Sequence, residues 1–165
     1  MELATRQQAD SDSWFLERIC RLTASNLGRI IRRQRNFRTL ACDILYHKPP
    51  AALPSLVFGR RMEKEAVAQY LRLHPEYEVT ESGLLVHPTL CFLAASPDRM
   101  ATDPQTGDRG VLEVKCPSSI LTTPTVAAVE KPSFCLYKVD GKVCLKRTHP
   151  YFWQVQGQMA CSELL

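Results

Sequence analysis

The chain has 165 residues, of which 45% are hydrophobic and 23% are charged, and its formal net charge is +4. These proportions predict one globular domain over residues 1–165 and exclude a disordered or low-complexity protein. The sequence has no apolar run of membrane-spanning length and no hydrophobic leader over residues 1–13, so we expect no membrane partner.

The first functional candidates lie around the start of a short predicted helix. Apolar residues recur with helical spacing over residues 27–31, directly after Thr23, Ser25 and Asn26, which are residue types that begin helices. Ser25 is therefore expected at a helix N-terminus, where backbone N–H groups bind anions. Arg18 can bind phosphate oxygens through two donors at once. The alternative is that Ser25 only caps the helix and Arg18 is a surface charge.

Basic residues are concentrated in the first half of the chain. Residues 1–72 carry 13 Lys and Arg against 7 Asp and Glu, whereas residues 73–165 carry 8 against 10. Five arginines stand in a stretch without acidic residues: Arg29, Arg32, Arg33, Arg35 and Arg38. Such a stretch predicts contact with the phosphate backbone of DNA without reading of bases, although it is also compatible with a solvated helix face.

A longer helix is predicted over residues 58–74. Apolar residues recur with helical spacing at positions 62, 66, 67, 70 and 71. Glu63 lies near the centre of this apolar stripe, whereas Glu65 projects from the opposite, solvated side. A glutamate directed at the core is costly to bury unless a cation receives it, so Glu63 is a candidate metal ligand. Alternatively, Glu63 complements the helix dipole or pairs with Arg60 or Arg61.

Two strands are predicted in the middle of the chain, over residues 90–95 and 110–115. Turn-forming residues over 103–108 predict that a hairpin joins them. Because side chains alternate along a strand, Glu113 and Lys115 are expected to share one face.

Asp98 and the Glu113–Lys115 pair are expected near strand ends, because one proline precedes Asp98 and another ends the second strand. The carboxylates of Asp98 and Glu113, with the Val114 carbonyl, offer the hard oxygen ligands that Mg²⁺ prefers. Lys115 would orient or help deprotonate an attacking water and offset charge on a phosphate. The alternative interpretation is a solvated cross-strand ion pair and a turn aspartate.

Two further elements are predicted toward the C-terminal end. Residues 134–137 and 142–145 form strands around a tight turn at 139–141, a hairpin that we expect to shape a DNA channel. Pro150 begins a short helix over residues 149–159 that carries three glutamines. Glutamine can donate to and accept from a water or a phosphate oxygen, although such a helix is also typical of a packing element with polar edges.

The seven cysteines contain no Cys-x-x-Cys pair, and the four histidines are equally dispersed. A structural zinc site is therefore not expected, and the odd number of cysteines argues against a disulfide framework. Several cysteines stand in apolar, strand-like runs, which predicts buried thiols in a reducing intracellular compartment, the nucleus or the cytoplasm.

Six motifs occur in one order at a characteristic spacing: Trp14 with Arg18, Thr23-Ala24-Ser25, Phe58-Gly59 with Glu63, Ser96-Pro97-Asp98, Leu112-Glu113-Val114-Lys115-Cys116-Pro117, and Gln154-Val155-Gln156. On these motifs the chain resembles the lambda-exonuclease-like family, the YqaJ viral recombinase branch of the PD-(D/E)XK nucleases. The match runs from about residue 14 to residue 159 within a single domain.

The resemblance implies a role for each matching residue of the catalytic centre. Asp98 and Glu113 would bind the metals, with Glu63 as a further acidic contributor. Lys115 would be the catalytic lysine, and Gln156 would be the glutamine near the nucleophilic water.

The resemblance also implies that Arg18 and Ser25 hold the 5′-terminal phosphate of the DNA strand being degraded. The implied fold is α/β and restriction-endonuclease-like, with a mixed central β-sheet flanked by helices. Mg²⁺ would be the cofactor, with Mn²⁺ as a substitute. DNA would be the partner, and a second copy of the chain or a single-strand annealing protein are further candidates.

The chain departs from the phage pattern in two ways. The predicted hairpin between Pro117 and His149 is an insertion, and the chain ends at Leu165, where this fold normally continues, so we expect a C-terminally truncated domain. The favoured function is a metal-dependent 5′ to 3′ exonuclease on linear duplex DNA ends in recombination or repair. The alternatives are a structure-specific endonuclease of the same fold and an inactive DNA-end-binding module.

Overall fold

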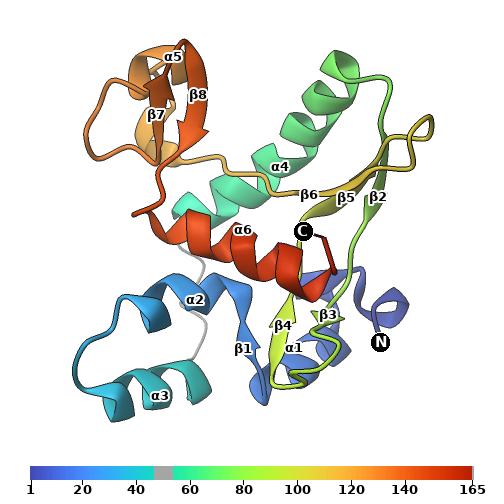
Figure 1. The fold of residues 1–165 in the computed structure, drawn as a ribbon, viewed down its shortest axis with the longest axis vertical. Helices are drawn as coiled ribbons and strands as arrows, with labels where there is room; N and C mark the ends of the chain where they lie inside the picture. The colour runs from blue at the N-terminus through green and yellow to red at the C-terminus, as the bar shows by residue number, and fades with distance from the viewer. Residues whose placement is uncertain (47–53, 165) are drawn as a thin grey trace.

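The structure is a computed structural model that describes residues 1–46 and 54–164 (Figure 1). The helices are α1 (Asp12–Ile19), α2 (Ala24–Ile31), α3 (Phe37–Leu45), α4 (Pro54–Leu73), α5 (Thr125–Ala128) and α6 (Pro150–Cys161), with 3-10 turns η1 (Leu3–Thr5), η2 (Gln8–Asp10) and η3 (Ser118–Ile120). The strands are β1 (Leu22–Thr23), β2 (Glu78–Glu81), β3 (Leu85–Val86), β4 (Leu93–Ala95), β5 (Arg99–Thr102), β6 (Arg109–Leu112), β7 (Leu136–Val139) and β8 (Lys142–Leu145). None of the described helices is both long and apolar enough to cross a membrane.

The strands of the described residues form two three-stranded sheets and a separate hairpin. In the first sheet, of order β1-β4-β3, β1 runs parallel to β4 and β3 runs antiparallel to it; the second, of order β2-β5-β6, is antiparallel. The α/β class is therefore confirmed, but the expected central sheet divides between β4 and β5. The segment Ser96-Pro97-Asp98 joins these two strands, and a proline nitrogen cannot donate to a sheet ladder.

The predicted strands differ from the observed ones at their ends. The strand predicted over 90–95 begins only at Leu93, because the Leu93 N–H donates to the Leu90 carbonyl at 2.8 Å and closes a turn. The strand predicted over 110–115 is β6, which starts and ends earlier in the chain. The turn over 103–108 does connect a hairpin, but the partner of β6 is β5, a strand that the sequence analysis missed.

The pairing of β5 with β6 fixes where the two sequence motifs lie. Arg99 stands opposite Leu112 in this antiparallel ladder. Continuing the register by one residue on each strand brings Asp98 and Glu113 side by side. The hairpin therefore joins the two predicted motifs at one end of its ladder.

Helix α6 packs closely on α2, and both match predicted helices. Two glycines make this approach possible, because a Cβ at Gly28 would lie 2.9 Å from the Pro150 Cα and a Cβ at Gly157 would lie 3.1 Å from the Ala24 Cβ. Such distances are too short for unstrained packing. In Figure 1, α6 lies between α2 and the β7–β8 hairpin. The buried cluster beside this interface consists of Ala24, Ala95 and Cys161.

Helix α4 confirms the helix predicted over residues 58–74, although it begins earlier, at Pro54. The predicted hairpin is also confirmed as β7–β8. Its turn residues Asp140 and Gly141 have φ angles of 49° and 76°, as a tight primed turn requires.

The expectation of buried thiols is wrong for several cysteines. All seven are free, and Cys161 is buried, but Cys20, Cys42 and Cys91 are exposed. Cys91 is exposed because residues 90–92 form the turn before β4 instead of continuing the strand.

Candidate active site

Asp98 lies where the chain passes from one sheet to the other. Its Oδ2 accepts a hydrogen bond from the Val114 N–H at 2.6 Å, and the preceding Pro97 is fully buried. This bond attaches the segment after β4 to the segment after β6. The two motifs singled out in the sequence are therefore in direct contact.

Glu113 and Lys115 lie just beyond β6, which ends at Leu112, and not within a strand as predicted. The Glu113 side chain is only 8% exposed, and its carboxylate pairs with Lys115. Gln154 donates to Oε1 at 2.5 Å and Gln158 donates to Oε2 at 2.5 Å. The solvated ion pair considered as an alternative does not describe this buried carboxylate.

The glutamines that reach the site are not the one singled out by the family resemblance. Gln156 is exposed on α6, whereas Gln154 and Gln158 stand one helical turn apart on the face toward Glu113. The i, i+4 spacing of Gln154 and Gln158 was the signal in the sequence that could have identified this pair. The structure thus directs Gln156 away from the carboxylates, because it projects from the opposite side of the helix.

Glu63 reaches the site from α4. Its Oε1 lies 3.3 Å from a guanidinium nitrogen of Arg99, and its side chain is 32% exposed. Arg99 follows Asp98 directly, so this ion pair connects α4 to the same junction; Arg60 and Arg61, the partners considered from the sequence, are not the ones it contacts. Glu65 points to solvent, as predicted, with a side chain that is 65% exposed.

A wide cavity of about 460 Å³ lies between α4 and the segment after β6. Glu63, Asp98 and Lys115 are on its wall, together with Arg60 and Tyr151. The acidic site is therefore open to a large ligand on the α4 side.

The carboxylates at this site lie close enough to disfavour one another's ionisation. Burial raises the pKa of Asp98 to about 6, and the neighbouring carboxylates of Glu113 and Glu63 also raise it. The buried Oε1 of Gln158 also has no hydrogen-bond partner among the described residues. Neighbouring carboxylates that disfavour one another's ionisation, and an unpaired acceptor, suit a hydrated cation.

The carboxylates of this site do not form a closed metal cage. Within the described ranges, no three His, Cys, Asp or Glu side chains are clustered closely enough to enclose an ion. Mg²⁺ is usually bound by one or two carboxylates and keeps several waters, so Asp98 and Glu113 are the residues that could hold such an ion.

A second cavity, of about 180 Å³, connects the carboxylates with Arg18 and Ser25. The guanidinium of Arg18 stacks 3.9 Å from the ring centroid of Trp14, whose Nε1 donates to the Ser96 Oγ at 2.8 Å. Burial lowers the pKa of Arg18 to about 10, which leaves it charged at neutral pH. Ser25 is the second residue of α2, and its Oγ lies 3.0 Å from the Thr23 Oγ1.

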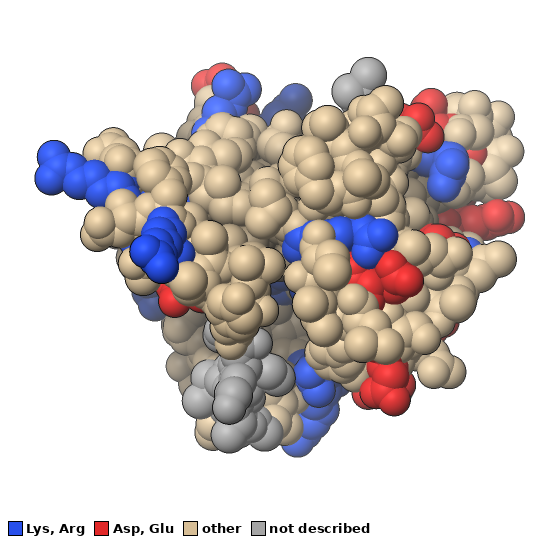
Figure 2. Space-filling model, turned by 90° about the horizontal axis from the view of Figure 1, so that it is seen from below, with Lys and Arg blue, Asp and Glu red and all other residues tan. Residues whose placement is uncertain are grey.

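The five arginines of the basic stretch lie on and after α2. Arg29, Arg32 and Arg33 line a cavity of about 320 Å³ beside Pro150, whereas Arg35 and Arg38 are exposed. Figure 2 shows the molecule from below the view of Figure 1. Basic side chains prevail on its left half, the side on which α2 and α3 lie in Figure 1, and acidic side chains are more frequent on its right half.

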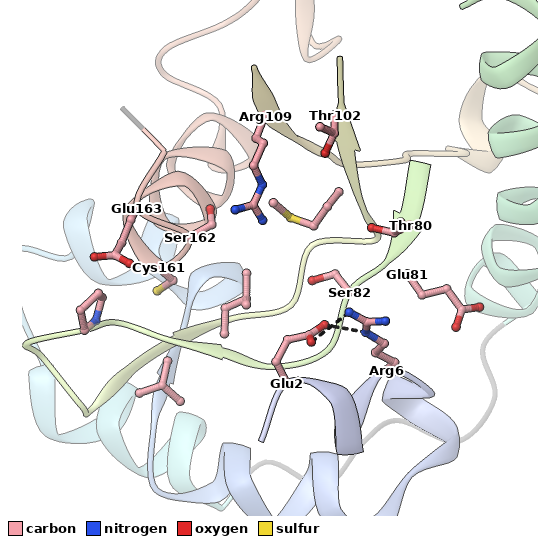
Figure 3. Close-up of a pocket in the computed structure, with 14 residues that line it drawn as sticks. Glu2, Arg6, Thr80, Glu81, Ser82, Thr102, Arg109, Cys161, Ser162 and Glu163 are labelled. Atoms are coloured by element: carbon pink, nitrogen blue, oxygen red, sulfur yellow. Dashed lines mark hydrogen bonds and ion pairs between the residues drawn. The ribbon is translucent and has the colours of Figure 1, made fainter. Parts of the chain in front are cut away.

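A cavity of about 360 Å³ between the N-terminal segment, strands β2, β3 and β5 and the end of α6 is a poorer candidate for the active site (Figure 3). Glu2 forms an ion pair with Arg6 at 2.9 Å and accepts from the Gly83 N–H at 2.9 Å. Its charge therefore serves to hold the N-terminal segment in place.

The chain belongs to the YqaJ-like viral recombinase domain family, whose model matches residues 13–164. Its fold is similar to the crystal structure of LHK-Exo in complex with dAMP, with a TM-score of 0.66 and 26% sequence identity over 93% of this chain and 70% of that chain. The structure of an alkaline exonuclease (LHK-Exo) from Laribacter hongkongensis gives a TM-score of 0.65 and 25% identity with the same coverage. No curated protein matches the sequence.

Proposed function

We propose that this chain is a Mg²⁺-dependent DNA exonuclease that degrades one strand of a linear duplex from its 5′ end. The observation that carries the proposal is that one cavity is lined by two groups of residues: Arg18 and Ser25, and Asp98, Glu113 and Lys115. A basic end and an acidic end in one cavity suit a strand whose terminal phosphate and next phosphodiester are bound together. The family and the similarity to an alkaline exonuclease support the same class of enzyme.

Asp98 and Glu113 would hold Mg²⁺, or Mn²⁺ in its place, with the Val114 carbonyl and Glu63 as further oxygen donors. When bound, the ion supplies Lewis-acid stabilisation of the charge that develops on the phosphate. Gln154 and Gln158 fix the Glu113 carboxylate from two sides, so that its orientation is set before substrate arrives.

Lys115 holds the attacking water and offsets negative charge on the pentacovalent phosphate. Its Nζ lies 5.1 Å from the ring centroid of Tyr151, which keeps the cation beside the carboxylates. The water oxygen bonds to phosphorus and loses a proton to solvent, the bond to the 3′ oxygen breaks, and that oxygen takes up a proton from solvent, so that no net proton is consumed by the exchange. The next nucleotide then carries the new 5′-phosphate, which is again a ligand for Arg18, so each cleavage generates the substrate of the next.

An assay on end-labelled linear DNA and closed circular DNA, with Mg²⁺ or with EDTA, tests the catalytic assignment. Asp98→Ala and Lys115→Ala should abolish cleavage of linear DNA while retaining DNA binding in Ca²⁺, and higher Mg²⁺ should not rescue Lys115→Ala. Undiminished cleavage by either variant would exclude this site. Cleavage of closed circles would indicate an endonuclease, and binding without turnover would indicate an end-binding module.

The polarity is tested with duplexes that carry a 5′-phosphate or a 5′-hydroxyl. The phosphorylated end should be degraded faster, and Arg18→Ala should remove most of a preference that we expect to be about ten- to hundredfold. Arg32→Ala is the matched control, because a backbone contact weakens binding to both ends equally and reduces the salt dependence. Equal rates on both ends in the unmodified protein would rule out the 5′-phosphate pocket.

A further inference from the structure

A third cavity, of about 270 Å³, adjoins the same carboxylate and lysine on the side of the β7–β8 hairpin. Glu113 and Lys115 stand on its wall. Most of the remaining lining is apolar and comprises Ile120, Phe134, Leu136, Leu145, Tyr151 and Val155. The cavity is thus unlike the one that contains Arg18, although both reach the same catalytic pair.

The hairpin and α6 build this cavity by ordinary side-chain alternation. Leu136 and Leu145 stand opposite each other in the β7–β8 ladder and are half-buried, whereas Tyr137, on the other face of the hairpin, is 37% exposed. Val143 is on the same face as Leu145 but nearer the turn, away from the cavity wall, and is 52% exposed. Tyr151 and Val155 lie one turn apart on the same face of α6. The base of the hairpin is closed by the Lys146 N–H, which donates to the Cys135 carbonyl at 2.8 Å.

The position of this cavity and the side chains on its wall together indicate which chemical group it binds. A group that binds here while a phosphodiester is held at Glu113 and Lys115 must belong to a nucleotide next to that phosphodiester. Unpaired bases stack on aromatic side chains, and Tyr151 and Phe134 supply two aromatic rings. The volume falls just below the range of about 300–1,000 Å³ that is typical of pockets for drug-sized ligands, as suits a single base.

We propose that this cavity receives the unpaired nucleobase of a nucleotide adjoining the cleaved phosphodiester, stacked between Tyr151 and Phe134. The inference rests on the proposed nuclease function and adds to it a base-binding subsite formed by the hairpin. Because every base has an aromatic face, the subsite separates the end of the duplex without selecting a sequence.

The test compares 5′-phosphorylated duplexes with intact nucleotides and duplexes that carry an abasic analogue at the first or the second position of the degraded strand. At one of these positions the abasic analogue should lower the single-turnover rate by about five- to hundredfold, in keeping with the stacking energy of one base. Phe134→Ala should lower the rate on the intact duplex and remove the difference in rate between intact and abasic duplexes. Val143→Ala, at an exposed position near the turn of the same hairpin and away from the cavity wall, should retain both the rate and the difference.

A binding measurement keeps this test independent of turnover. With 2-aminopurine at the same position and Ca²⁺ in place of Mg²⁺, binding should change the fluorescence as the base stacks, and Phe134→Ala or the cavity-filling Leu136→Trp should abolish that change. Equal rates on intact and abasic ends, or an unchanged fluorescence signal, would overturn the base subsite while leaving the nuclease in place. Absence of cleavage of every substrate would instead overturn the proposed function, and the fluorescence would still decide whether the base is bound.

Discussion

Helices α6 and α4 both serve the acidic site, but they are attached to the protein in different ways. Helix α6 buries Gly157, Gln158 and Cys161 and packs closely on α2, whereas α4, with 20 residues, buries only Val67. From α6, two amide donors fix Glu113; from α4, Glu63 reaches the site through one ion pair with Arg99. One carboxylate is therefore held in a fixed orientation and the other is free to adjust to what binds beside it.

The largest effect is expected at Asp98, the carboxylate between the two helices. Since its folded-state pKa is raised to about 6, ionisation of Asp98 opposes folding as the pH rises from about 4 to above 6. Asp98→Asn should therefore raise the free energy of unfolding of the metal-free protein at pH 8, by at most about 3 kcal/mol. Chemical denaturation in EDTA at several pH values checks this.

The gain from Asp98→Asn should vanish at pH values well below the unfolded-state pKa of 3.8, where the aspartate is neutral in both states. Glu113→Gln and Glu63→Gln should each lower the Asp98 pKa, with the larger shift from Glu113, whose carboxylate is the stronger of the two influences. A gain that persists at pH 3 would contradict the electrostatic cause.

Substitutions of the α6 glutamines test whether activity depends on the fixed orientation of the Glu113 carboxylate. Gln158→Leu should lower the single-turnover rate at saturating Mg²⁺ about a hundredfold, because it removes one of the donors that orient Glu113. Gln156→Leu, with a similar change on the exposed face of α6, is the control and should retain the rate. Equal losses in both variants would show that the helix, and not the hydrogen bond, determines activity.

The difference in packing predicts opposite effects of the same substitution in two helices. Gly28→Ala should lower the free energy of unfolding by about 1–2 kcal/mol, since its new methyl group meets the Pro150 backbone. Gly59→Ala lies in α4, where the added Cβ would have no atom within 4 Å beyond its chain neighbours and the backbone of its own helix, and it should stabilise the protein by up to about 1 kcal/mol. Urea unfolding of both variants measures the contrast; destabilisation by Gly59→Ala would contradict the loose attachment of α4.

The smallest effect is expected at Glu63, the carboxylate that α4 brings to the site. Glu63→Gln should raise the Mg²⁺ concentration needed for half-maximal activity about fivefold, because it reduces the negative charge near Asp98 without removing the two principal ligands. Glu65→Gln, two residues away on the solvated face, should leave the requirement unchanged. A metal titration of the cleavage rate measures both effects, and a stronger effect of Glu65→Gln would mean that Glu65, and not Glu63, faces the carboxylates.

Local pattern predicted Asp98, Glu113 and Lys115 as neighbours because turn residues and strand alternation are encoded within a short stretch of chain. The same reasoning missed β5, since Arg99–Thr102 begins with a charged residue directly after Pro97-Asp98. It also could not find Arg99 as the partner of Glu63, because that contact joins residues 36 positions apart in the sequence. Long-range packing, and not local propensity, determines such pairs.

The glutamines illustrate an intermediate case. Their presence on a helix was predictable, and helical spacing already distinguishes Gln154 and Gln158 from Gln156. Which face turns inward depends on the contact of Gly28 with Pro150 and of Gly157 with Ala24. Those contacts arise only once α2 and α6 are packed together.

The register of the β5–β6 hairpin has a practical consequence for protein engineering. The separation of Asp98 and Glu113 is determined by the ladder in which Arg99 faces Leu112, and the turn over 103–108 lies at its far end. An epitope or a fluorescent label inserted in that turn would leave the carboxylates where they are. A single-residue deletion inside either strand would instead rotate every following side chain to the other face of the sheet.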